Sequence, residues 1–303
     1  MTMVQKITRD KLTPVFDRRL EPVARVRPGE VFVVETEDSR GGRTRVPEHT
    51  TPEYLLAMRK RGYHGNPVTG PIFVEGAEAG DTLAVHILEQ KCDTLGYMGY
   101  WPFLFHLEDF FDKPATVLVE IRDGHVIFSD DIRIPVSPVI GTIGVCPPVE
   151  AILSGSMGRH CGNVDVQEIA AGSTVYLPVY VEGALLCLGD CHALQSDGEI
   201  GSVEMRSEIT LRCDVSKGRS ETMQWPRVET ADALVTIGIA TPLEEAARQA
   251  LREMIFWIGE RTGMTKHEAY LLIGCVGAWR PGQVQIPNYS MRCIFPKSYL
   301  RSR

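Results

Sequence analysis

Two short clusters of metal-binding and proton-transferring side chains lie near the middle of this sequence. The first runs from His160 to Asp165 and the second from Gly189 to Glu199, and the segment between them is strongly apolar. Carboxylates and imidazoles are costly to bury unless they are paired or bind a metal. We therefore predict that the two clusters form a site and not a solvated surface.

The spacing within the second cluster is typical of a metal site. Asp190 and His192 are two residues apart, so on a strand both side chains point to the same face. A carboxylate and an imidazole on one face suit Zn²⁺, and His160 or Asp165 could approach from another strand or loop. A Zn²⁺ ion with an open position lowers the pKa of its water to about 7 and polarises a carbonyl.

Glu199 has a natural role beside such a metal. A carboxylate there can take a proton from water and pass it to a leaving amine. Each residue alone also has an ordinary explanation, because Asp197-Gly198 is a common turn dipeptide and His160 can be a loop histidine. Only the combined pattern indicates a metal or acid–base site.

Other chemistries are less well supported by the sequence. Cys161 and Cys191 each follow or precede a histidine, but neighbours in sequence point to opposite faces of a strand, which disfavours a cysteine–histidine pair. The chain has neither a phosphate-binding loop nor a dinucleotide fingerprint. Its net charge is −7 and Arg59-Lys60-Arg61 is its densest basic run, so we expect no nucleic acid partner.

Several features favour the cytoplasm. The segment Met1 to Leu12 lacks the pattern of a signal peptide, and apolar windows such as Leu271 to Trp279 are about half of a membrane span. The eight cysteines are scattered without a CxxC pair, which indicates reduced thiols. We expect a cytoplasmic protein with no membrane partner.

The elements that must position these residues are mostly strands. The chain has 303 residues and 44% hydrophobic content, enough for a large core. Strand patterns run over Val31 to Thr36, Thr82 to Leu88 and Val203 to Val215, and Asp123-Gly124 marks a hairpin between residues 116–121 and 125–128. We predict a mainly β protein with a sandwich- or barrel-like body over residues 1–240.

Three helices interrupt this pattern. One short N-terminal helix begins at Thr51-Pro52 and ends near Gly62. A second extends from Thr241 to Gly263, and a third follows from Thr265 towards Gly274, with predicted capping boxes at the start of both. We predict that residues 241–274 form an αα-hairpin packed on the body, and that residues 1–303 form a single domain.

The sequence around these residues resembles the acetamidase/formamidase family over nearly its whole length. The matching runs keep the order and spacing of the family's motifs: Gly70–Leu83, Ile140–Val145, Arg159–Asp165, Leu177–Val179 with Gly183–Leu185, Gly189–Glu199 and Pro296–Ser298. The resemblance implies a β-rich fold, hydrolysis of short amides to a carboxylate and ammonia, and a divalent metal, zinc with calcium as an alternative.

The resemblance also implies a set of site residues. The residues that match the family's motifs are His160, Asn163, Asp165, Asp190, His192, Asp197 and Glu199. In this hypothesis His160, Asp165, Asp190 and His192 are metal ligands, Glu199 is the catalytic base, and Asn163 donates to the carbonyl oxygen. Asp197 is expected to bind substrate, and the protein is expected to be a homo-oligomer.

The sequence departs from the family's pattern at two places. Ser196 replaces a glycine, and serine would be strained there if the glycine has a positive φ. Arg18 and Arg19 replace small polar residues after Asp17, in a segment that the resemblance places at the site. We assign Asp17 and Arg18 to substrate binding, where the arginines would favour a negatively charged substrate; solvated surface arginines are the alternative.

The leading hypothesis is therefore a metal-dependent hydrolase of a small linear amide such as formamide or acetamide. The alternative is a non-catalytic β-rich binding or assembly protein, in which the clusters hold a structural cation such as Ca²⁺. An open position beside Glu199 favours the enzyme, and a closed shell of ligands favours the alternative.

Overall fold

The structure is a computed structural model that describes residues 4–61, 65–104, 107–218 and 222–300. It is 43% strand and 17% helix, which confirms the prediction of a mainly β protein. Within the described residues, no helix is both long enough and apolar enough to cross a membrane.

The first part of the chain forms short strands around one helical excursion. Its elements are β1 (Gln5–Ile7), β2 (Leu12–Thr13), β3 (Val15–Phe16), β4 (Ala24–Val26), β5 (Val31–Thr36), the 3-10 helix η1 (Pro47–Thr50), α1 (Pro52–Lys60) and β6 (Val68–Val74). Thr51 caps α1 by accepting a hydrogen bond from the backbone N–H of Tyr54, as its position before Pro52 predicts.

The middle of the chain supplies the long strands. Its elements are β7 (Thr82–Tyr100), β8 (Ala115–Arg122), β9 (His125–Ile127), β10 (Arg133–Pro135), β11 (Val139–Gly144), β12 (Ile152–Leu153), β13 (Met157–Gly158), β14 (Cys161–Asn163), β15 (Thr174–Pro178), β16 (Leu186–Gln195) and β17 (Ser202–Ser216). The predicted hairpin at Asp123-Gly124 connects β8 to β9, which confirms that turn.

The last part of the chain combines strands with two helices. Its elements are β18 (Arg227–Glu229), β19 (Ala233–Ala240), α2 (Leu243–Thr262), α3 (Lys266–Val276), β20 (Ala278–Pro281), β21 (Tyr289–Pro296) and the 3-10 helix η3 (Lys297–Tyr299). Since β21 pairs with β19, the two helices are inserted between strands of the same sheet. The single-domain organisation stays a prediction.

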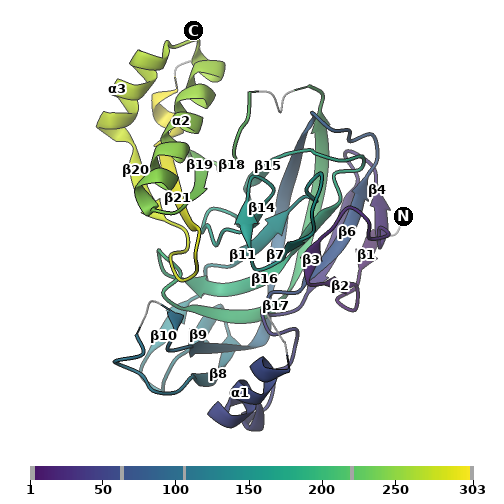
Figure 1. The fold of residues 1–303 in the computed structure, drawn as a ribbon, viewed down its shortest axis with the longest axis vertical. Helices are drawn as coiled ribbons and strands as arrows, with labels where there is room; N and C mark the ends of the chain where they lie inside the picture. The colour runs from purple at the N-terminus through teal and green to yellow at the C-terminus, as the bar shows by residue number, and fades with distance from the viewer. Residues whose placement is uncertain (1–3, 62–64, 105–106, 219–221, 301–303) are drawn as a thin grey trace.

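Two long antiparallel strands, β7 and β17, organise the sheet (Figure 1). One edge of β17 pairs with β5 and β16, and β7 pairs with β8 near its end and with β15 near its start. From β15 the sheet continues through β18, β19, β21 and β20. The sheet curls into half a barrel, which agrees with the predicted body.

The core follows the alternation that the sequence shows in β17. Val203, Met205, Ile209, Leu211 and Cys213 share one parity and are buried among other apolar strand residues. Because successive strand residues point to opposite faces, this parity defines the core side of the strand.

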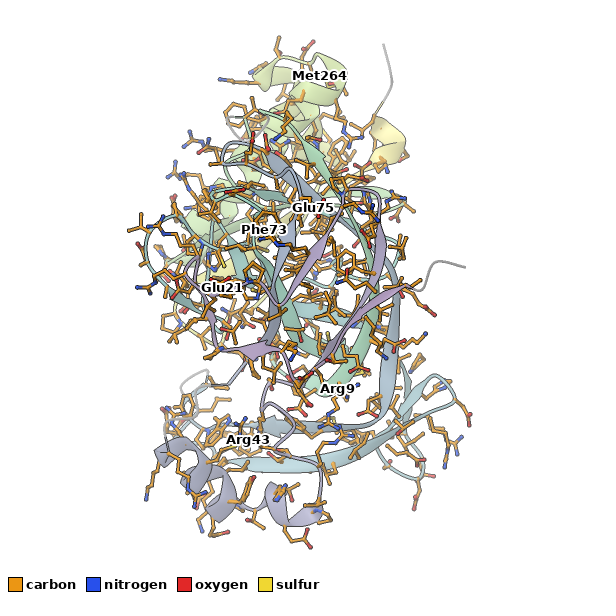
Figure 2. All side chains as sticks on the ribbon, turned by 90° about the vertical axis from the view of Figure 1, so that its right-hand side faces the viewer. Arg9, Glu21, Arg43, Phe73, Glu75 and Met264 are labelled. Atoms are coloured by element: carbon orange, nitrogen blue, oxygen red, sulfur yellow. The ribbon has the colours of Figure 1, made fainter. Side chains whose placement is uncertain are left out.

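The helices lie at the two ends of the sheet (Figures 1 and 2). Near one end, α2 packs across β19 and β21, and Met264 lies in the turn before α3. At the other end α1 lies by β8, with Arg43 nearby in Figure 2. The αα-hairpin is therefore present as predicted, on the sheet end formed by β19 and β21.

The capping of the two C-terminal helices differs from the prediction in one case. Thr265 and Glu268 form the predicted capping box at the start of α3. The box predicted for Thr241 and Glu244 is wrong, because Pro242 is the N-cap residue of α2 and no side chain caps it.

Candidate active site

Strand β11 brings the two sequence clusters together. It pairs with β14 on one side, where Thr142 faces Asn163, and with β16 on the other, where Thr142 faces Gly189. The first cluster therefore lies on one flank of β11 and the second cluster on the other, although about 25 residues separate them in the chain.

Side-chain hydrogen bonds join the clusters across β11. The Thr142 hydroxyl donates to Asn163 Oδ1 at 2.6 Å and lies 3.1 Å from Asp190 Oδ2. Asn66, from the loop before β6, donates its Nδ2 hydrogens to the same two oxygens at 2.7 and 2.6 Å. Asn163 Nδ2 in turn donates to Asp165 Oδ2 at 3.0 Å, so this network fixes the position of both carboxylates.

Five acidic or imidazole side chains converge beside this network. Asp165, Asp190 and His192 each offer a ligand atom, and these three atoms lie within 4.8 Å of one another. His192, Glu199 and Glu204 form a second group of the same kind, which shares the histidine. Glu204 lies opposite His192 in the pairing of β16 with β17.

Gln195 fixes which nitrogen of His192 faces the carboxylates. Gln195 Nε2 donates to the carbonyl oxygen of Asp165 at 2.6 Å, so its Oε1 faces His192 Nδ1, at 2.7 Å. An amide oxygen only accepts, and therefore His192 Nδ1 carries the hydrogen. His192 Nε2 then faces Glu204 at 3.2 Å and Asp190 at 3.6 Å.

Burial and mutual repulsion shift the pKa values of these groups. Burial raises the pKa of Asp165 well above its usual range, and the charges of Glu199 and Asp190 add to this rise. Burial likewise raises the pKa of Glu199 to about 8. Burial alone would lower the pKa of His192, but Glu204 and Asp190 outweigh it and raise that pKa well above its usual range.

Unpartnered atoms in the cluster test whether a cation fits. Asp165 Oδ1, Asp190 Oδ1 and His192 Nε2 are buried and form no hydrogen bond, although His192 Nε2 lies at ion-pair distance from Glu204. Buried polar atoms are nearly always satisfied, so three unsatisfied atoms in one group need an explanation. One carboxylate oxygen from each aspartate and one imidazole nitrogen are suitable donors for a divalent cation, so the residues fit a metal.

The backbone at this site has unfavourable conformations. Asp165, Asp190, Glu199 and Asn66 all have φ between 49° and 54°, in the left-handed region. That region costs little for glycine but of order 1–3 kcal/mol for other residues in general. Four such residues around one cluster indicate that the fold sustains strain here to aim their side chains.

Gly141 forms the floor beneath the cluster. A Cβ atom added at this position would lie 2.5 Å from Asp165 Oδ1 and 2.9 Å from His192 Cε1. Glycine is therefore required here because the acidic and imidazole groups approach the backbone of β11 closely.

A large cavity of about 610 Å³ opens next to the cluster. Asn66, Asn163, Asp190, Glu199 and Glu204 line it, so part of the cluster faces open space. The wall also contains many aromatic and aliphatic side chains, several of them from the segment between β7 and β8.

His160, the fourth predicted ligand, packs against an aromatic ring. Its ring packs edge-on against Phe16, with 5.0 Å between the ring centroids, and burial lowers its pKa to about 4. Neither group of converging ligand atoms found among the described residues includes His160. The structure brings Asp165, Asp190 and His192 together. His160 Nε2 is also buried without a hydrogen-bond partner, and a ligand role for His160 stays a prediction.

The predicted substrate-binding residues also lie outside the cavity. Asp17 forms hydrogen bonds with Arg19, whose side chain is 71% exposed, and Arg18 is exposed. Asp197 pairs with Arg292 and Arg280. Asp17, Arg18 and Asp197 are not among the described residues that line the cavity, so their substrate roles stay predictions.

Ser196 fits the turn that it occupies. It is not among the described non-glycine residues with positive φ, so the strain considered for a serine here does not arise. Its carbonyl accepts the backbone N–H of Glu199, which closes the turn that carries the glutamate.

Two functional candidates, Glu204 and Asn66, escape sequence reasoning. Glu204 has the parity opposite to the buried apolar residues of β17, which usually indicates a solvated face. Its position opposite His192 becomes visible only through the strand pairing. Asn66 lies in a loop, where no pattern of residues singles it out.

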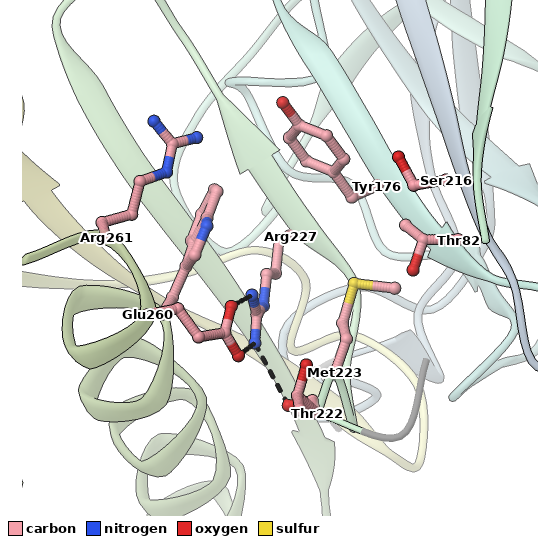
Figure 3. A pocket seen from close by; sticks show the side chains of 9 residues that line it. Thr82, Tyr176, Ser216, Thr222, Met223, Arg227, Glu260 and Arg261 are labelled. Carbon is pink, nitrogen blue, oxygen red and sulfur yellow. Dashed lines mark hydrogen bonds and ion pairs between the residues drawn. The ribbon is translucent and has the colours of Figure 1, made fainter. Parts of the chain in front are cut away.

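A second cavity, of about 170 Å³, lies between α2 and the sheet (Figure 3). Its charged residues are paired: Arg227 binds Glu253 and Glu260, and Arg261 binds Glu229. Among the described residues the charged groups of this cavity are therefore all paired, and the cavity belongs to the packing of α2 on the sheet.

Comparisons with known proteins identify the family of this chain. The model of the acetamidase/formamidase family matches residues 7–158 and 149–300. A crystal structure of an acetamidase from Bacillus halodurans is 34% identical and has a TM-score of 0.89, covering 97% of this chain and 98% of that one. The chain therefore belongs to the acetamidase/formamidase family.

Two curated relatives are more distant. An acetamidase from Mycolicibacterium smegmatis is 27% identical over 358 residues, 89% of this chain and 87% of that protein. A formamidase from Methylophilus methylotrophus is 26% identical over 264 residues. That alignment covers 65% of this chain and 62% of the formamidase, so the chain spans less than two thirds of that relative.

Proposed function

We propose that this protein hydrolyses a short linear amide to a carboxylate and ammonia at the cluster around Asp190 and His192. Family membership supports amide hydrolysis, since the relatives are named acetamidase and formamidase. The observation that carries the proposal is the cavity beside the cluster, because a substrate can reach Asp190 and Glu199 from it. A closed structural cation site, the alternative function, has no use for such a cavity.

We further propose that Asp165, Asp190 and His192 hold a divalent cation, with Zn²⁺ the first candidate and Ca²⁺ the alternative. The three unpartnered atoms of these residues support this choice. When bound, the ion supplies Lewis-acid chemistry by polarising the amide carbonyl and acidifying water. His192 must be neutral to bind the ion. Metal binding therefore displaces the second proton of the imidazole, which Glu204 and Asp190 otherwise stabilise.

Glu199 is the proposed general base and acid. Its pKa of about 8, raised by burial, lets it accept a proton from the attacking water and release it to the leaving amine near neutral pH. Glu204 is less suited to this role, because the charge of His192 overcomes the effect of burial and lowers its pKa to about 2. Two neighbouring carboxyl groups with separated pKa values divide the work in this way.

Asn163 orients the reaction in two ways. One hydrogen of its Nδ2 goes to Asp165 Oδ2, which holds that carboxylate in place. The other hydrogen has no partner among the described residues and can be donated to the amide carbonyl oxygen as negative charge develops there.

The proposal is tested by metal analysis combined with ammonia release from formamide and acetamide. Asp190→Asn and His192→Ala are each expected to reduce bound metal well below one ion per chain and to abolish ammonia release. Asp214→Asn is the matched control, because Asp214 pairs with His86 and Arg212 away from the cluster. Full metal retention in both cluster variants would contradict the ligand assignment, and metal binding without ammonia release would favour the alternative function.

Glu199→Gln separates proton transfer from metal binding. The variant is expected to keep its metal and lose roughly 10²–10⁴ in kcat, the usual contribution of general acid–base catalysis. Turnover equal to that of the wild type would show that another group moves the proton.

A further inference from the structure

The cavity beside the cluster is much larger than formamide or acetamide require. Its volume is about 610 Å³. Acetamide has four non-hydrogen atoms and fills roughly 120 Å³ if each atom takes the share of one liquid water, about 30 Å³. Most of the cavity therefore stays empty around such a substrate, and its volume is instead in the range of pockets for larger ligands.

The lining of the cavity contains two kinds of side chain. Asn163, Asp190, Glu199 and Glu204 of the cluster form its polar part. Much of the remaining wall is aromatic or aliphatic, with seven such side chains between positions 97 and 111: Tyr97, Tyr100, Trp101, Phe103, Leu104, Leu107 and Phe111. A ligand that suits both parts of the lining has a polar group that reaches the carboxylates and an apolar part that contacts these rings.

The aromatic wall is organised by contacts between its own members. The rings of Tyr100 and Phe111 lie 4.4 Å apart, and those of Trp101 and Phe103 lie 5.8 Å apart. Yet Phe103 and Tyr100 remain partly exposed. Apolar surface of this kind, continuous with a catalytic cluster, is typical of a binding site for an apolar group.

Two arginines stiffen this wall. The guanidinium of Arg40 lies 4.3 Å from the centre of the Tyr97 ring, and that of Arg59 lies 3.9 Å from the centre of the Phe103 ring. Such cation–π contacts hold the orientation of the rings. Among the described residues neither arginine forms an ion pair with a carboxylate. The alternative to an apolar ligand is therefore an anionic ligand that pairs with one of these arginines.

We propose that the preferred substrate is a primary amide whose acyl group is bulky and apolar, such as an arylalkyl or medium-chain alkyl amide. The amide group lies beside the carboxylates of the cavity lining and the acyl group contacts the aromatic wall. This inference rests on the proposed amide hydrolysis and goes further by naming the substrate class.

The test is steady-state ammonia release by the wild-type protein with acetamide, butyramide, hexanamide and phenylacetamide. Each buried methylene is expected to raise kcat/KM about fourfold, which corresponds to about 0.8 kcal/mol per methylene. Phenylacetamide is expected to exceed acetamide at least tenfold. A kcat/KM that stays level or falls with acyl size overturns the inference while acetamide turnover preserves the proposed function. No ammonia from any of the four amides contradicts the proposed function itself.

The charge of the acyl group is tested with a matched pair. Succinamate and 4-methylpentanamide have similar shapes, but the first ends in a carboxylate and the second in two methyl groups. The neutral amide is expected to have the higher kcat/KM. A higher value for succinamate overturns the apolar assignment and points to Arg40 or Arg59 as a carboxylate site.

Variants of the aromatic wall locate the effect. Trp101→Ser is expected to lower the ratio of kcat/KM for phenylacetamide to that for acetamide at least tenfold. Phe110→Ala is the control, because Phe110 belongs to the same segment, is 77% exposed and does not line the cavity. An unchanged ratio in Trp101→Ser, or an equal loss in Phe110→Ala, contradicts the placement of the acyl group.

Discussion

At the scale of single residues, the orientation of His192 depends on one neighbouring side-chain amide. Gln195 accepts the Nδ1 hydrogen of His192 and donates to the carbonyl of Asp165, so one side chain positions two candidate ligands. Groups that orient metal ligands in this way typically contribute 10–100-fold to metal affinity.

We therefore predict that Gln195→Ala lowers metal affinity 10–100-fold without removing a ligand. Competition with a chromophoric chelator measures this affinity. Gln90→Ala is a suitable control, because Gln90 also donates to a backbone carbonyl, that of Val139, but has no hydrogen bond to the cluster. Equal affinities in wild type and Gln195→Ala would show that the strand alone orients His192.

Asp38 gives the protein a predictable pH dependence. Its side chain accepts the backbone N–H groups of Arg40 and Gly42, and burial raises its pKa from 3.8 to about 6. The folded protein therefore holds this proton more tightly than the unfolded chain. Its stabilising effect is complete below about pH 4 and is lost as the pH rises to about 6.

Asp38→Asn removes this dependence, since asparagine does not titrate but keeps an oxygen that accepts the two N–H groups. Between pH 4 and pH 7 the wild type is expected to lose up to about 3 kcal/mol of its free energy of unfolding through Asp38, and the variant is expected not to lose it. Urea unfolding at both pH values, with a chelator present, measures the change. A difference between the two proteins that is the same at both pH values would contradict the raised pKa.

The sequence predicts the site residues whose positions follow from local periodicity, but not those whose positions depend on strand pairing. The two-residue spacing of Asp190 and His192 predicts that they lie together, and both belong to β16 and to one group of ligand atoms. Glu204 joins them only through the register of β17 on β16, which a single sequence does not reveal. Asn66 reaches the cluster from a loop whose path depends on the complete fold.

At the element scale, α2 shows the same limit. Its apolar residues recur every three or four positions in the sequence, which predicts one buried stripe that includes Leu251 and Ile258 and a polar face that includes Glu253. Ile258 is fully buried, whereas Leu251 is only partly buried. Glu253, predicted on the polar face, is 1% exposed and pairs with Arg227 at 2.7 Å. In the sequence, a buried ion pair cannot be distinguished from two charged residues on the surface. The predicted apolar stripe is therefore correct in part, and the prediction that Glu253 is exposed is wrong.

We predict that Ile258→Ala costs 2–5 kcal/mol in the free energy of unfolding, as for a large buried side chain. Leu251→Ala is expected to cost less, because part of its side chain already contacts solvent. Turnover per folded molecule is expected to stay unchanged in both, since α2 packs on β19 and β21 and does not line the larger cavity. Urea unfolding and ammonia release measure the two effects, and a selective loss of activity would place α2 at the site.

At the scale of the whole molecule, most of the architecture follows from the sequence. Alternation and turn residues predict β5 with its observed bounds and the hairpin of β8 and β9. The prediction ends β7 at Leu88, but the strand continues to Tyr100 because it pairs with β17 and β8 beyond that point. Homo-oligomer formation stays a prediction, which light scattering after size-exclusion chromatography tests.

The central place of β16 in the sheet has a consequence for local opening of the protein. β16 pairs with β11 and β17 and also with β6, so its backbone is enclosed by other strands. Amide hydrogens in such a strand exchange with deuterium only when the whole fold opens. We expect the amides of Cys191 and His192 to be among the slowest to exchange, and those of the exposed turn at Asp130 and Asp131 to exchange rapidly. Under rising urea, loss of deuterium protection at His192 and loss of ammonia release are then expected at the same concentration.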